Sequence, residues 1–279
     1  MTERQRSACV IGYPAKHSRS PMLHGYWIKQ YGLNADYRAE EIAPEHVAEF
    51  ITSLTEHGYV GANVTMPHKE VAFELSQPDE RATAVGAANT LWFEDGILRS
   101  TNTDVEGFTL ALDAASPGWD QQVDEAVVLG AGGAGRAVVY GLIERGVSTI
   151  HVVNRTVAKA QAMRDRFGGS IRPASWESLP KLLDGSRLLV NTTALGMHGQ
   201  PALDIDISAI AENAVVADIV YVPLTTPLLA AAQARGLATS NGLDMLLYQA
   251  VRGFELWFGT RPQVTREQYD LLANDIESG

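Results

Sequence analysis

Apolar residues along this chain fall into short continuous runs that alternate with longer amphipathic stretches. Within residues 44–57, for example, Val47, Phe50, Ile51 and Leu54 recur at helical spacing. Strands that alternate with helices are typical of parallel sheets, so the pattern predicts an α/β fold. The runs that we interpret as buried strands are residues 8–12, 59–64, 126–129, 149–153, 188–191 and 214–220.

A glycine-rich turn, residues 130–135, joins one predicted strand to a helix that ends near Arg145. Gly130, Gly132 and Gly135 have the spacing G-x-G-x-x-G. The first glycine permits a sharp turn, the second lets backbone approach a pyrophosphate, and the third lets the helix pack on the strand. Because the turn lies between a strand and a helix, we predict dinucleotide binding rather than a plain tight turn.

The strand that follows this turn ends in Asn154-Arg155-Thr156. Proteins that bind NAD carry a carboxylate near this position, which holds the ribose 2′-hydroxyl, and this chain has none there. Arg155, with Lys159 one turn further on, offers positive charge to a 2′-phosphate. We therefore predict NADP rather than NAD, with an ordinary surface arginine as the alternative.

Polar side chains also follow the predicted strands of the first third. Ligands of open α/β sheets bind beyond the carboxyl ends of the strands, so these side chains are candidate ligand groups. A competing explanation, which the sequence alone favours, is that Ser20 caps a helix with Pro21 at its first position. The candidate residues are Ser18, Ser20, Asn63, Thr65 and Lys69.

Lys69 and Asp104 are candidates for acid–base chemistry. Lys69 follows Pro67 in the first turn of a predicted helix, where the helix dipole disfavours a cation. Burial there would disfavour the ammonium form, which suits a group that donates and accepts a proton. The carboxylate of Asp104 is a candidate partner. The competing explanations are a solvated lysine and an aspartate that caps the helix over residues 105–114.

Composition narrows the class of protein. The 279 residues are 46% hydrophobic and carry a formal net charge of −11, which fits a globular chain with two domains. The acidic balance argues against nucleic acid or an anionic membrane surface as partner. The single cysteine, Cys9, excludes an internal disulfide framework and fits a reducing, cytoplasmic location. We expect no signal peptide, no membrane span and no metal site.

Eight short motifs occur in order along nearly the whole chain, at residues 17–21, 63–69, 86–90, 102–104, 130–135, 154–156, 191–197 and 242–249. Together they resemble the motifs of the shikimate dehydrogenases. The resemblance implies an N-terminal open α/β substrate domain (1–104) and a Rossmann-like NADP-binding domain (105–239). C-terminal helices (240–279) would return to the first domain, with a cleft between the domains. The implied activity is NADPH-dependent, reversible reduction of 3-dehydroshikimate to shikimate in aromatic amino-acid biosynthesis.

The resemblance also implies a role for each matching residue. Lys69 and Asp104 correspond to the catalytic pair. Ser18 and Ser20 match positions that hold the substrate carboxylate, and the positions near the ring hydroxyls are Thr65, Asn89 and Gln249. The cofactor-binding positions are Gly130, Ala131, Gly132, Gly133, Ala134, Gly135, Asn154, Arg155, Thr156 and Lys159, with Tyr221 and Gly242 near the nicotinamide.

Several alternatives stay open at this stage. Many family members carry an aromatic residue where this chain has His68, and a histidine is expected to tune substrate choice or the response to pH. An enzyme that oxidises quinate is one alternative, although Ser18, Ser20 and Arg155 favour the shikimate type. A non-catalytic NADPH-binding sensor is another, and the intact pair of Lys69 and Asp104 counts against it. The partner is expected to be a small-molecule substrate, and the chain a monomer or homodimer.

Overall fold

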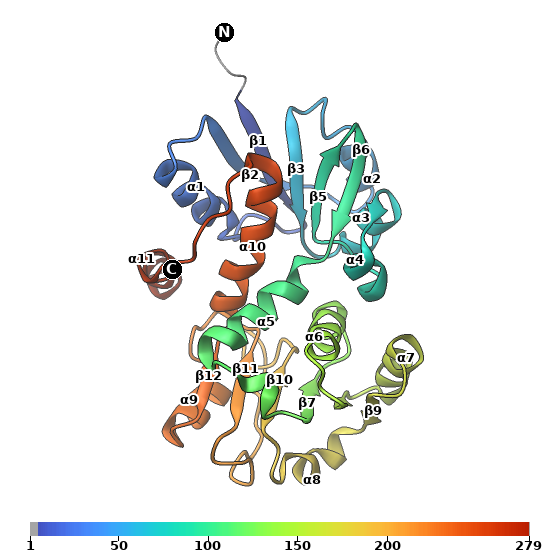
Figure 1. Cartoon of the computed structure of the whole chain (residues 1–279), viewed down its shortest axis with the longest axis vertical. Coiled ribbons are helices and arrows are strands. Elements are labelled where there is room, and N and C mark those ends of the chain that lie inside the picture. The colour runs from blue at the N-terminus through green and yellow to red at the C-terminus, as the bar shows by residue number, and fades with distance from the viewer. Residues whose placement is uncertain (1–4, 279) are drawn as a thin grey trace. The chain divides into compact units, whose positions relative to one another are not determined.

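The computed structural model describes residues 5–278, which form two compact units (Figure 1). The first consists of Met1–Thr103 and Leu247–Leu272, and the second of Asp104–Leu246 and Ala273–Gly279. Each unit contains one six-stranded sheet, which confirms the predicted α/β fold with two domains. Within residues 5–278, no helix has both the length and the apolar character that crossing a bilayer requires.

The sheet of the first unit has the strand order β2-β1-β3-β5-β6-β4. Its central strands pair in parallel: β1 (Arg6–Gly12) lies between β2 (Ala35–Glu41) and β3 (Tyr59–Val64). Because each of these strands ends at the same edge, the loops that follow β1 and β3 lie side by side. The polar residues of those loops are thereby brought together.

The remaining strands make this sheet mixed rather than wholly parallel. β5 (Thr90–Glu94) runs antiparallel to β3 and forms a hairpin with β6 (Ile97–Thr101), beside the short edge strand β4 (Gln77–Pro78). Asp95 and Gly96 turn the hairpin with φ of 51° and 78°. A two-residue turn joins only antiparallel strands, so this sheet combines parallel and antiparallel pairs.

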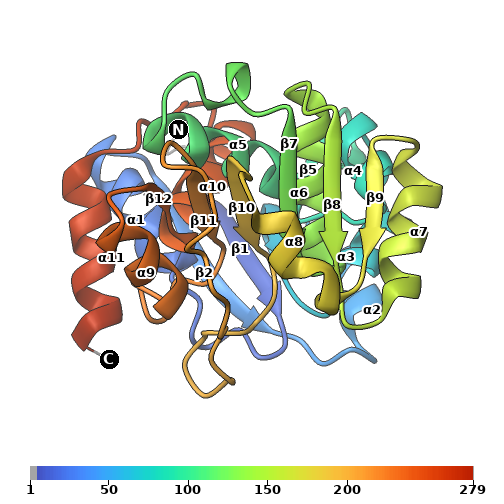
Figure 2. The same cartoon turned by 90° about the horizontal axis from the view of Figure 1, so that it is seen from below.

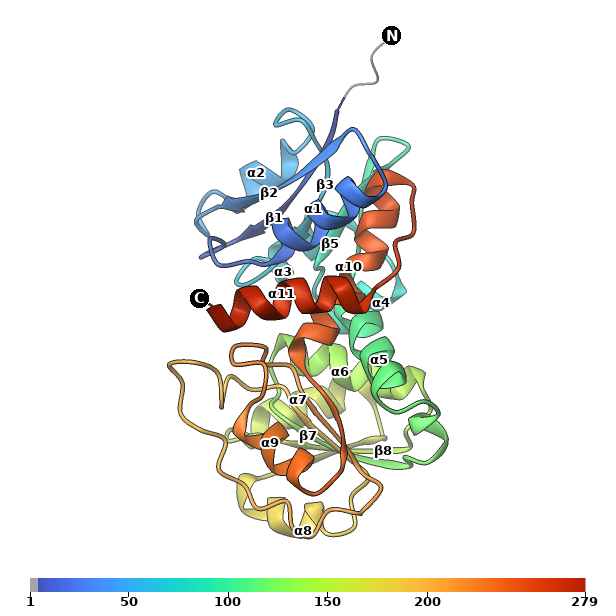
Figure 3. The same cartoon turned by 90° about the vertical axis from the view of Figure 1, so that its left-hand side faces the viewer.

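Six of the described helices have two or more residues in the first unit. The helix predicted over residues 44–57 is much shorter, because Thr52 and Ser53 bond their hydroxyls back to the carbonyl of Glu49 and compete with helix continuation. Figure 3 shows α1 and α2 beside the sheet. The helices are α1 (Ser20–Gln30), α2 (Val47–Thr52), α3 (Lys69–Glu74), α4 (Glu80–Val85), α10 (Gly242–Phe258) and α11 (Arg266–Ser278).

The sheet of the second unit is wholly parallel, with the order β12-β11-β10-β7-β8-β9 (Figure 2). The strand order reverses at β7, which has β8 on one side and β10 on the other, as in doubly wound dinucleotide-binding folds. The strands are β7 (Glu125–Leu129), β8 (Thr149–Val153), β9 (Ile171–Ala174), β10 (Leu188–Asn191), β11 (Val215–Asp218) and β12 (Ala238–Ser240).

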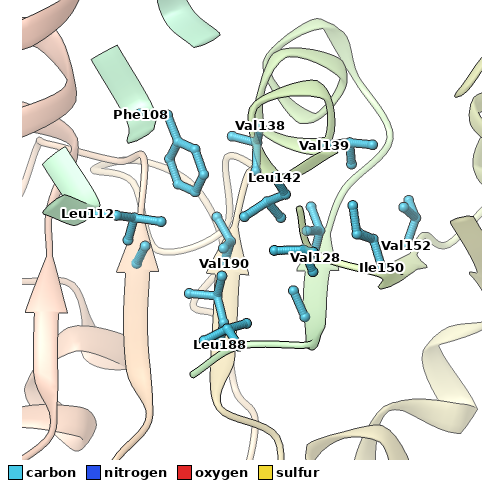
Figure 4. Close-up of a cluster of buried hydrophobic side chains, with 14 of the residues drawn as sticks. Phe108, Leu112, Val128, Val138, Val139, Leu142, Ile150, Val152, Leu188 and Val190 are labelled. Atoms are coloured by element: carbon cyan, nitrogen blue, oxygen red, sulfur yellow. The ribbon is translucent and has the colours of Figure 1, made fainter. Parts of the chain in front are cut away.

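Both faces of this second sheet are buried, which explains why its central strands β7, β10 and β11 are largely apolar. Leu188 and Val190 of β10 point into one cluster (Figure 4), while Leu189 points into the cluster on the other face. The first cluster includes side chains of α5 (Thr103–Ala115), α6 (Gly133–Glu144) and α7 (Val157–Phe167). The second includes those of α8 (Leu179–Leu183) and α9 (Pro227–Ala234). Two 3-10 turns lie at Trp119–Gln121 and Trp176–Ser178.

A buried histidine, His24 of α1, lies within an aromatic cluster of the first unit. Its ring stacks on Tyr37 with centroids 4.1 Å apart and contacts Trp27, Phe254 and Trp257 at 5.5–5.9 Å. Neither ring nitrogen has a hydrogen-bond partner among the described residues. Burial lowers the pKa of His24 from 6.5 to about 3, although the nearby Asn63 side chain opposes the shift in part. The histidine is therefore a neutral core residue at physiological pH.

We predict that His24→Phe makes the protein less sensitive to acid. A folded-state pKa below the unfolded value of 6.5 favours the folded state fully above pH 6.5, and this contribution is lost as the pH falls towards 3. The slope is about 1.4 kcal/mol per pH unit for one group. Denaturant unfolding from pH 7 to pH 4 should therefore show a shallower fall of stability in His24→Phe than in the wild type.

His57 supplies the control for this prediction, because it is exposed and its ring stacks on Phe50 only 4.7 Å away. His57→Phe keeps a ring at that place and should retain the wild-type slope. Equal slopes for His24→Phe and the wild type would contradict the assignment of acid sensitivity to His24.

Candidate active site

The carboxyl edge of the first sheet gathers the predicted serines and Thr65. α1 begins at Ser20, which is 6% exposed, and the backbone N–H of Ser20 donates to the Ser18 hydroxyl at 3.2 Å. No side chain caps α1, so the interpretation of Ser20 as a helix cap is wrong by one position. The backbone of Thr65 bonds the carbonyl of Ile11 at 2.8 Å, which fixes Thr65 beside the end of β1.

Lys69 is the first residue of α3 and is half-buried. The residue before it, His68, is buried, and its Nε2 lies 2.7 Å from the carbonyl oxygen of Ile42. A carbonyl oxygen only accepts, so this nitrogen carries the proton. The backbone carbonyl of Lys69 in turn accepts from the N–H of Ala88 at 2.9 Å. Lys69 is thus held next to the segment that carries Asn89, while the influence of His68 on substrate choice or pH stays a prediction.

Asn89 and Gln249 meet through Thr103, in a buried cluster of the first unit. The backbone N–H of Thr103 donates to Asn89 Oδ1 at 2.7 Å, and the Thr103 hydroxyl lies 3.2 Å from Gln249 Oε1. The sequence motifs contain Thr103 and Thr90, yet nothing marked these threonines as parts of the site. The repeated dipeptide Asn-Thr, at 89–90 and again at 102–103, was the available hint.

Asp104 lies in the first turn of α5, which begins two residues earlier than expected, at Thr103. It is therefore not the cap of that helix, although a carboxylate is electrostatically favoured in a first turn. Asp104 belongs to the second unit and Lys69 to the first, so their pairing belongs to the proposal below.

The glycine turn of the second unit has the backbone that its spacing predicts. Gly130 has φ of 105°, a value that favours glycine, and an added Cβ would lie 2.7 Å from the hydroxyl oxygen of Thr192. A Cβ on Gly135 would lie 2.7 Å from the carbonyl oxygen of Gly130, so the helix and strand touch there. Gly132 faces open space and is the N-cap residue of α6, where it provides no side-chain cap, so the N-terminal N–H groups are accessible to an anion.

Asn154 ties the glycine turn to the loop after β8. Its Oδ1 accepts from the backbone N–H of Ala131 at 3.2 Å, and its Nδ2 donates to the carbonyl of Thr156 at 2.9 Å. Arg155 and Lys159 are exposed, and their side chains form no hydrogen bond or ion pair with any described residue. Two unpartnered cations beside an N-terminal helix turn suit a phosphate ligand.

The loop after β11, which carries Tyr221, is anchored by the buried Asp218. Its carboxylate accepts from Asn191 Nδ2 at 2.9 Å, from the backbone N–H of Val220 at 3.1 Å and from the Thr226 hydroxyl at 2.7 Å. Burial raises the pKa of Asp218 to about 6, against these bonds, which favour the charged form. Gly242 packs on this loop, since an added Cβ would lie 2.1 Å from the carbonyl oxygen of Ile219.

The fold and these features define the class of the protein. It is an α/β protein whose second unit is a Rossmann-type dinucleotide-binding sheet with a glycine turn at the switch point. Among residues 5–278, no group of three or more histidine, cysteine or carboxylate side chains has an arrangement that would hold a metal ion.

Family models match most of the chain. The model described as shikimate dehydrogenase substrate binding domain matches residues 10–91, and shikimate/quinate 5-dehydrogenase matches residues 111–219. The shikimate 5′-dehydrogenase C-terminal domain matches residues 242–266. The chain belongs to the shikimate dehydrogenase family, a family of oxidoreductases, which confirms the resemblance seen in its motifs.

Individual relatives agree over nearly their full length. The chain is 60% identical over 273 residues to the shikimate dehydrogenase (NADP(+)) of Rhodopseudomonas palustris strain BisB18, covering 98% of each chain. It is 59% identical over 271 residues to that of Nitrobacter winogradskyi, covering 97% of each.

Solved structures of more distant proteins share the fold. Shikimate 5-dehydrogenase of Thermus thermophilus in complex with NADP(H) and shikimate is 33% identical, with a TM-score of 0.83 over 97% of this chain and 99% of that one. Quinate dehydrogenase of Corynebacterium glutamicum in complex with NAD is 29% identical, with a TM-score of 0.89 over 96% and 99%.

We predict that alanine at Gly132 and at Gly135 have opposite consequences. Gly132→Ala adds a methyl group in open space, so stability should change by less than about 0.5 kcal/mol while the KM for the dinucleotide rises at least about tenfold. Gly135→Ala forces the new methyl group against Gly130 and should cost about 1–3 kcal/mol of unfolding free energy.

Denaturant unfolding and steady-state kinetics of both variants test this. A Gly132→Ala protein with unchanged dinucleotide KM would contradict the phosphate-binding role of the turn. A fully stable Gly135→Ala protein would contradict the packing role of the third glycine.

Proposed function

We propose that this chain is a shikimate dehydrogenase that uses NADP(H) and catalyses the reversible reduction of 3-dehydroshikimate to shikimate. The observation that supports it most is the buried cluster of Asn89, Thr103 and Gln249 at the edge of the first sheet. Side-chain amides held in fixed orientation suit a ligand with several hydroxyl groups. The relatives that share about 60% of this sequence are named for this activity.

The substrate-binding groups in this proposal divide by chemistry. The hydroxyls of Ser18 and Ser20, next to the first turn of α1, bind the substrate carboxylate. Thr65, Asn89 and Gln249 bind the ring hydroxyls. Ser20, Asn89 and Gln249 are each less than 9% exposed, so their polar groups are largely screened from water, which strengthens their hydrogen bonds.

The chemical step requires a proton at the oxygen of the reacting ketone. NADPH, when bound, supplies the hydride to the carbonyl carbon. Lys69 Nζ donates the proton to the carbonyl oxygen, which becomes the new hydroxyl, and takes that proton back in the reverse direction. The carboxylate of Asp104 holds the ammonium group in place and accepts a hydrogen bond from the neighbouring substrate hydroxyl. Such placed charges stabilise the negative charge that develops on oxygen.

Cofactor preference follows from the loop after β8. Arg155 and Lys159 bind the 2′-phosphate of NADP, Asn154 and Thr156 shape the loop, and the turn from Gly130 to Gly135 binds the pyrophosphate. Tyr221 and Gly242 lie near the nicotinamide in this proposal. The bonds from Asn154 to Ala131 and Thr156 support it, because they hold the glycine turn and the cationic loop together.

A quinate-oxidising enzyme is the second candidate, because the fold is also close to that of a quinate dehydrogenase, with a TM-score of 0.89. Assays of shikimate and quinate, each with NADP⁺ and with NAD⁺, separate the candidates. We expect shikimate with NADP⁺ to give the highest kcat/KM. No reduction of either cofactor with either substrate would favour the non-catalytic sensor instead.

We predict that Lys69→Ala lowers kcat for shikimate oxidation by about 100-fold or more, since a positioned general acid–base group contributes about 10²–10⁴ in rate. The KM for shikimate should change only a few-fold, because the ring is held by other side chains. Lys29→Ala, in the last turn of α1, is the control and should leave kcat unchanged. Near-normal turnover of Lys69→Ala would refute the role given to Lys69.

We predict that the double variant Arg155→Gln, Lys159→Gln raises the KM for NADP⁺ by about 10- to 100-fold, since each lost charge-assisted contact is worth about a factor of ten. The KM for NAD⁺, which lacks the 2′-phosphate, should stay within about twofold. Arg164→Gln, an exposed arginine in the last turn of α7, is the matched control. Equal losses for both cofactors would argue against 2′-phosphate recognition by this loop.

A further inference from the structure

A row of buried polar side chains crosses the first sheet behind the proposed substrate site. The Tyr37 hydroxyl on β2 donates to Asn63 Oδ1 on β3 at 2.7 Å. Asn63 Nδ2 donates to the Thr90 hydroxyl at the start of β5 at 3.1 Å. Burial raises the pKa of the Tyr37 hydroxyl, which therefore remains a donor at physiological pH. Donation thus runs in one direction, from β2 towards β5.

Backbone groups fix the orientation of both asparagine amides in this row. The branch of Asn63 that faces the backbone carbonyl of Asn89, at 3.3 Å, is the NH2 group, because a carbonyl only accepts. The branch of Asn89 that faces the backbone N–H of Thr103, at 2.7 Å, is the oxygen, because an N–H only donates. The NH2 branch of Asn89 is thereby directed away from Thr103.

The Thr90 hydroxyl is the hub of the row. It accepts from Asn63, so its single hydrogen is directed onward, to Asn89 Oδ1 at 3.1 Å or to the Thr103 hydroxyl at 3.2 Å. The Thr103 hydroxyl also has one hydrogen and two acceptors in reach, Asn89 Oδ1 at 3.1 Å and Gln249 Oε1 at 3.2 Å. When Thr90 supplies Asn89, the hydrogen of Thr103 goes to Gln249, so that each threonine hydroxyl donates to an amide oxygen.

We propose that Thr90 is a positioning residue for the substrate, resting on the function proposed above. Its side chain is 0% exposed and therefore out of reach of a ligand. The Thr90 hydroxyl accepts a hydrogen bond from Asn63 and donates one to the cluster of Asn89, Thr103 and Gln249. It thereby holds the amide oxygens of Asn89 and Gln249 inward and turns their NH2 branches towards the substrate hydroxyls.

Thr90→Val removes this hub and keeps the shape of the side chain. Asn63 then loses an acceptor and Asn89 Oδ1 loses a donor. The hydrogen of Thr103 is drawn to Asn89, so nothing in the row fixes which branch of the Gln249 amide faces the substrate. Because the second unit is untouched, the loss should fall on the substrate and not on the cofactor.

The experiment is steady-state oxidation of shikimate by NADP⁺ with the full chain, in the wild type and three variants. Thr90→Val should raise the KM for shikimate about fivefold or more while the KM for NADP⁺ stays within about twofold. Thr90→Ser restores a hydroxyl and should return both constants to within about twofold of the wild type. Thr109→Val is the matched control, because this buried hydroxyl bonds only carbonyls of its own helix.

Each outcome decides between supporting and overturning the proposal. An unchanged shikimate KM in Thr90→Val overturns it, and so does a parallel rise for both substrates or a Thr90→Ser protein as impaired as Thr90→Val. If Thr90→Val does not fold, Thr90→Cys keeps the volume with a weakly bonding group and must show the same selective rise. A wild type without shikimate-dependent reduction of NADP⁺ instead removes the proposed function, and this proposal with it.

Discussion

The bond of 2.7 Å from the backbone N–H of Thr103 to the Asn89 side chain is one of several in which an asparagine acts where a strand meets its loop. Beyond a strand end the ladder no longer satisfies backbone groups, and each buried one needs another partner. Asn154, which follows β8, accepts a hydrogen bond from the backbone N–H of Ala131 in the same way. Asn191, the last residue of β10, accepts one from the backbone N–H of Thr193. An asparagine side chain is short and carries both an acceptor and a donor. It can therefore hold a loop in place while the orientation of its own amide is fixed.

Hydrogen bonds at a strand end also explain how the buried carboxylate of Asp218 is tolerated beside the loop that carries Tyr221. Asp218, at the end of β11, is 1% exposed, and burial raises its pKa to about 6. Asn191, Thr226 and the backbone of Val220 together supply three donors, so the charged form is not left unsatisfied. Hydrogen bonds to both carboxylate oxygens make the loop rigid, which would suit the place beside the nicotinamide that we propose for Tyr221.

The sequence predicted those parts of the structure that depend on local pattern. The strands Tyr59–Val64, Thr149–Val153 and Leu188–Asn191 occur with the predicted bounds, because continuous apolar runs between turns have few other uses. The short edge strands β9 and β12 were missed, since Arg172, Pro173 and Thr239 break the apolar pattern. Most strand pairs join residues far apart in sequence, so no local pattern predicts the strand order of the first sheet or the hydrogen bonds of Thr90.

The proposed cofactor site of the second unit consists mainly of backbone groups, whereas the proposed substrate site of the first unit consists of side chains. This difference decides how much a sequence motif can predict about each site. In the second unit the proposed pyrophosphate site is the turn from Gly130 to Gly135, which would act through backbone N–H groups and close approach. Three glycines with fixed spacing, placed between a strand and a helix, therefore indicate it. In the first unit the proposed substrate groups Ser20, Asn89 and Gln249 come from α1, the loop before β5 and α10. In our proposal the orientation of the two amides depends on Thr90, which the substrate does not contact. Substrate choice in such a site can change through the supporting row while every motif residue stays in place. A motif match therefore carries more weight for the cofactor than for the substrate.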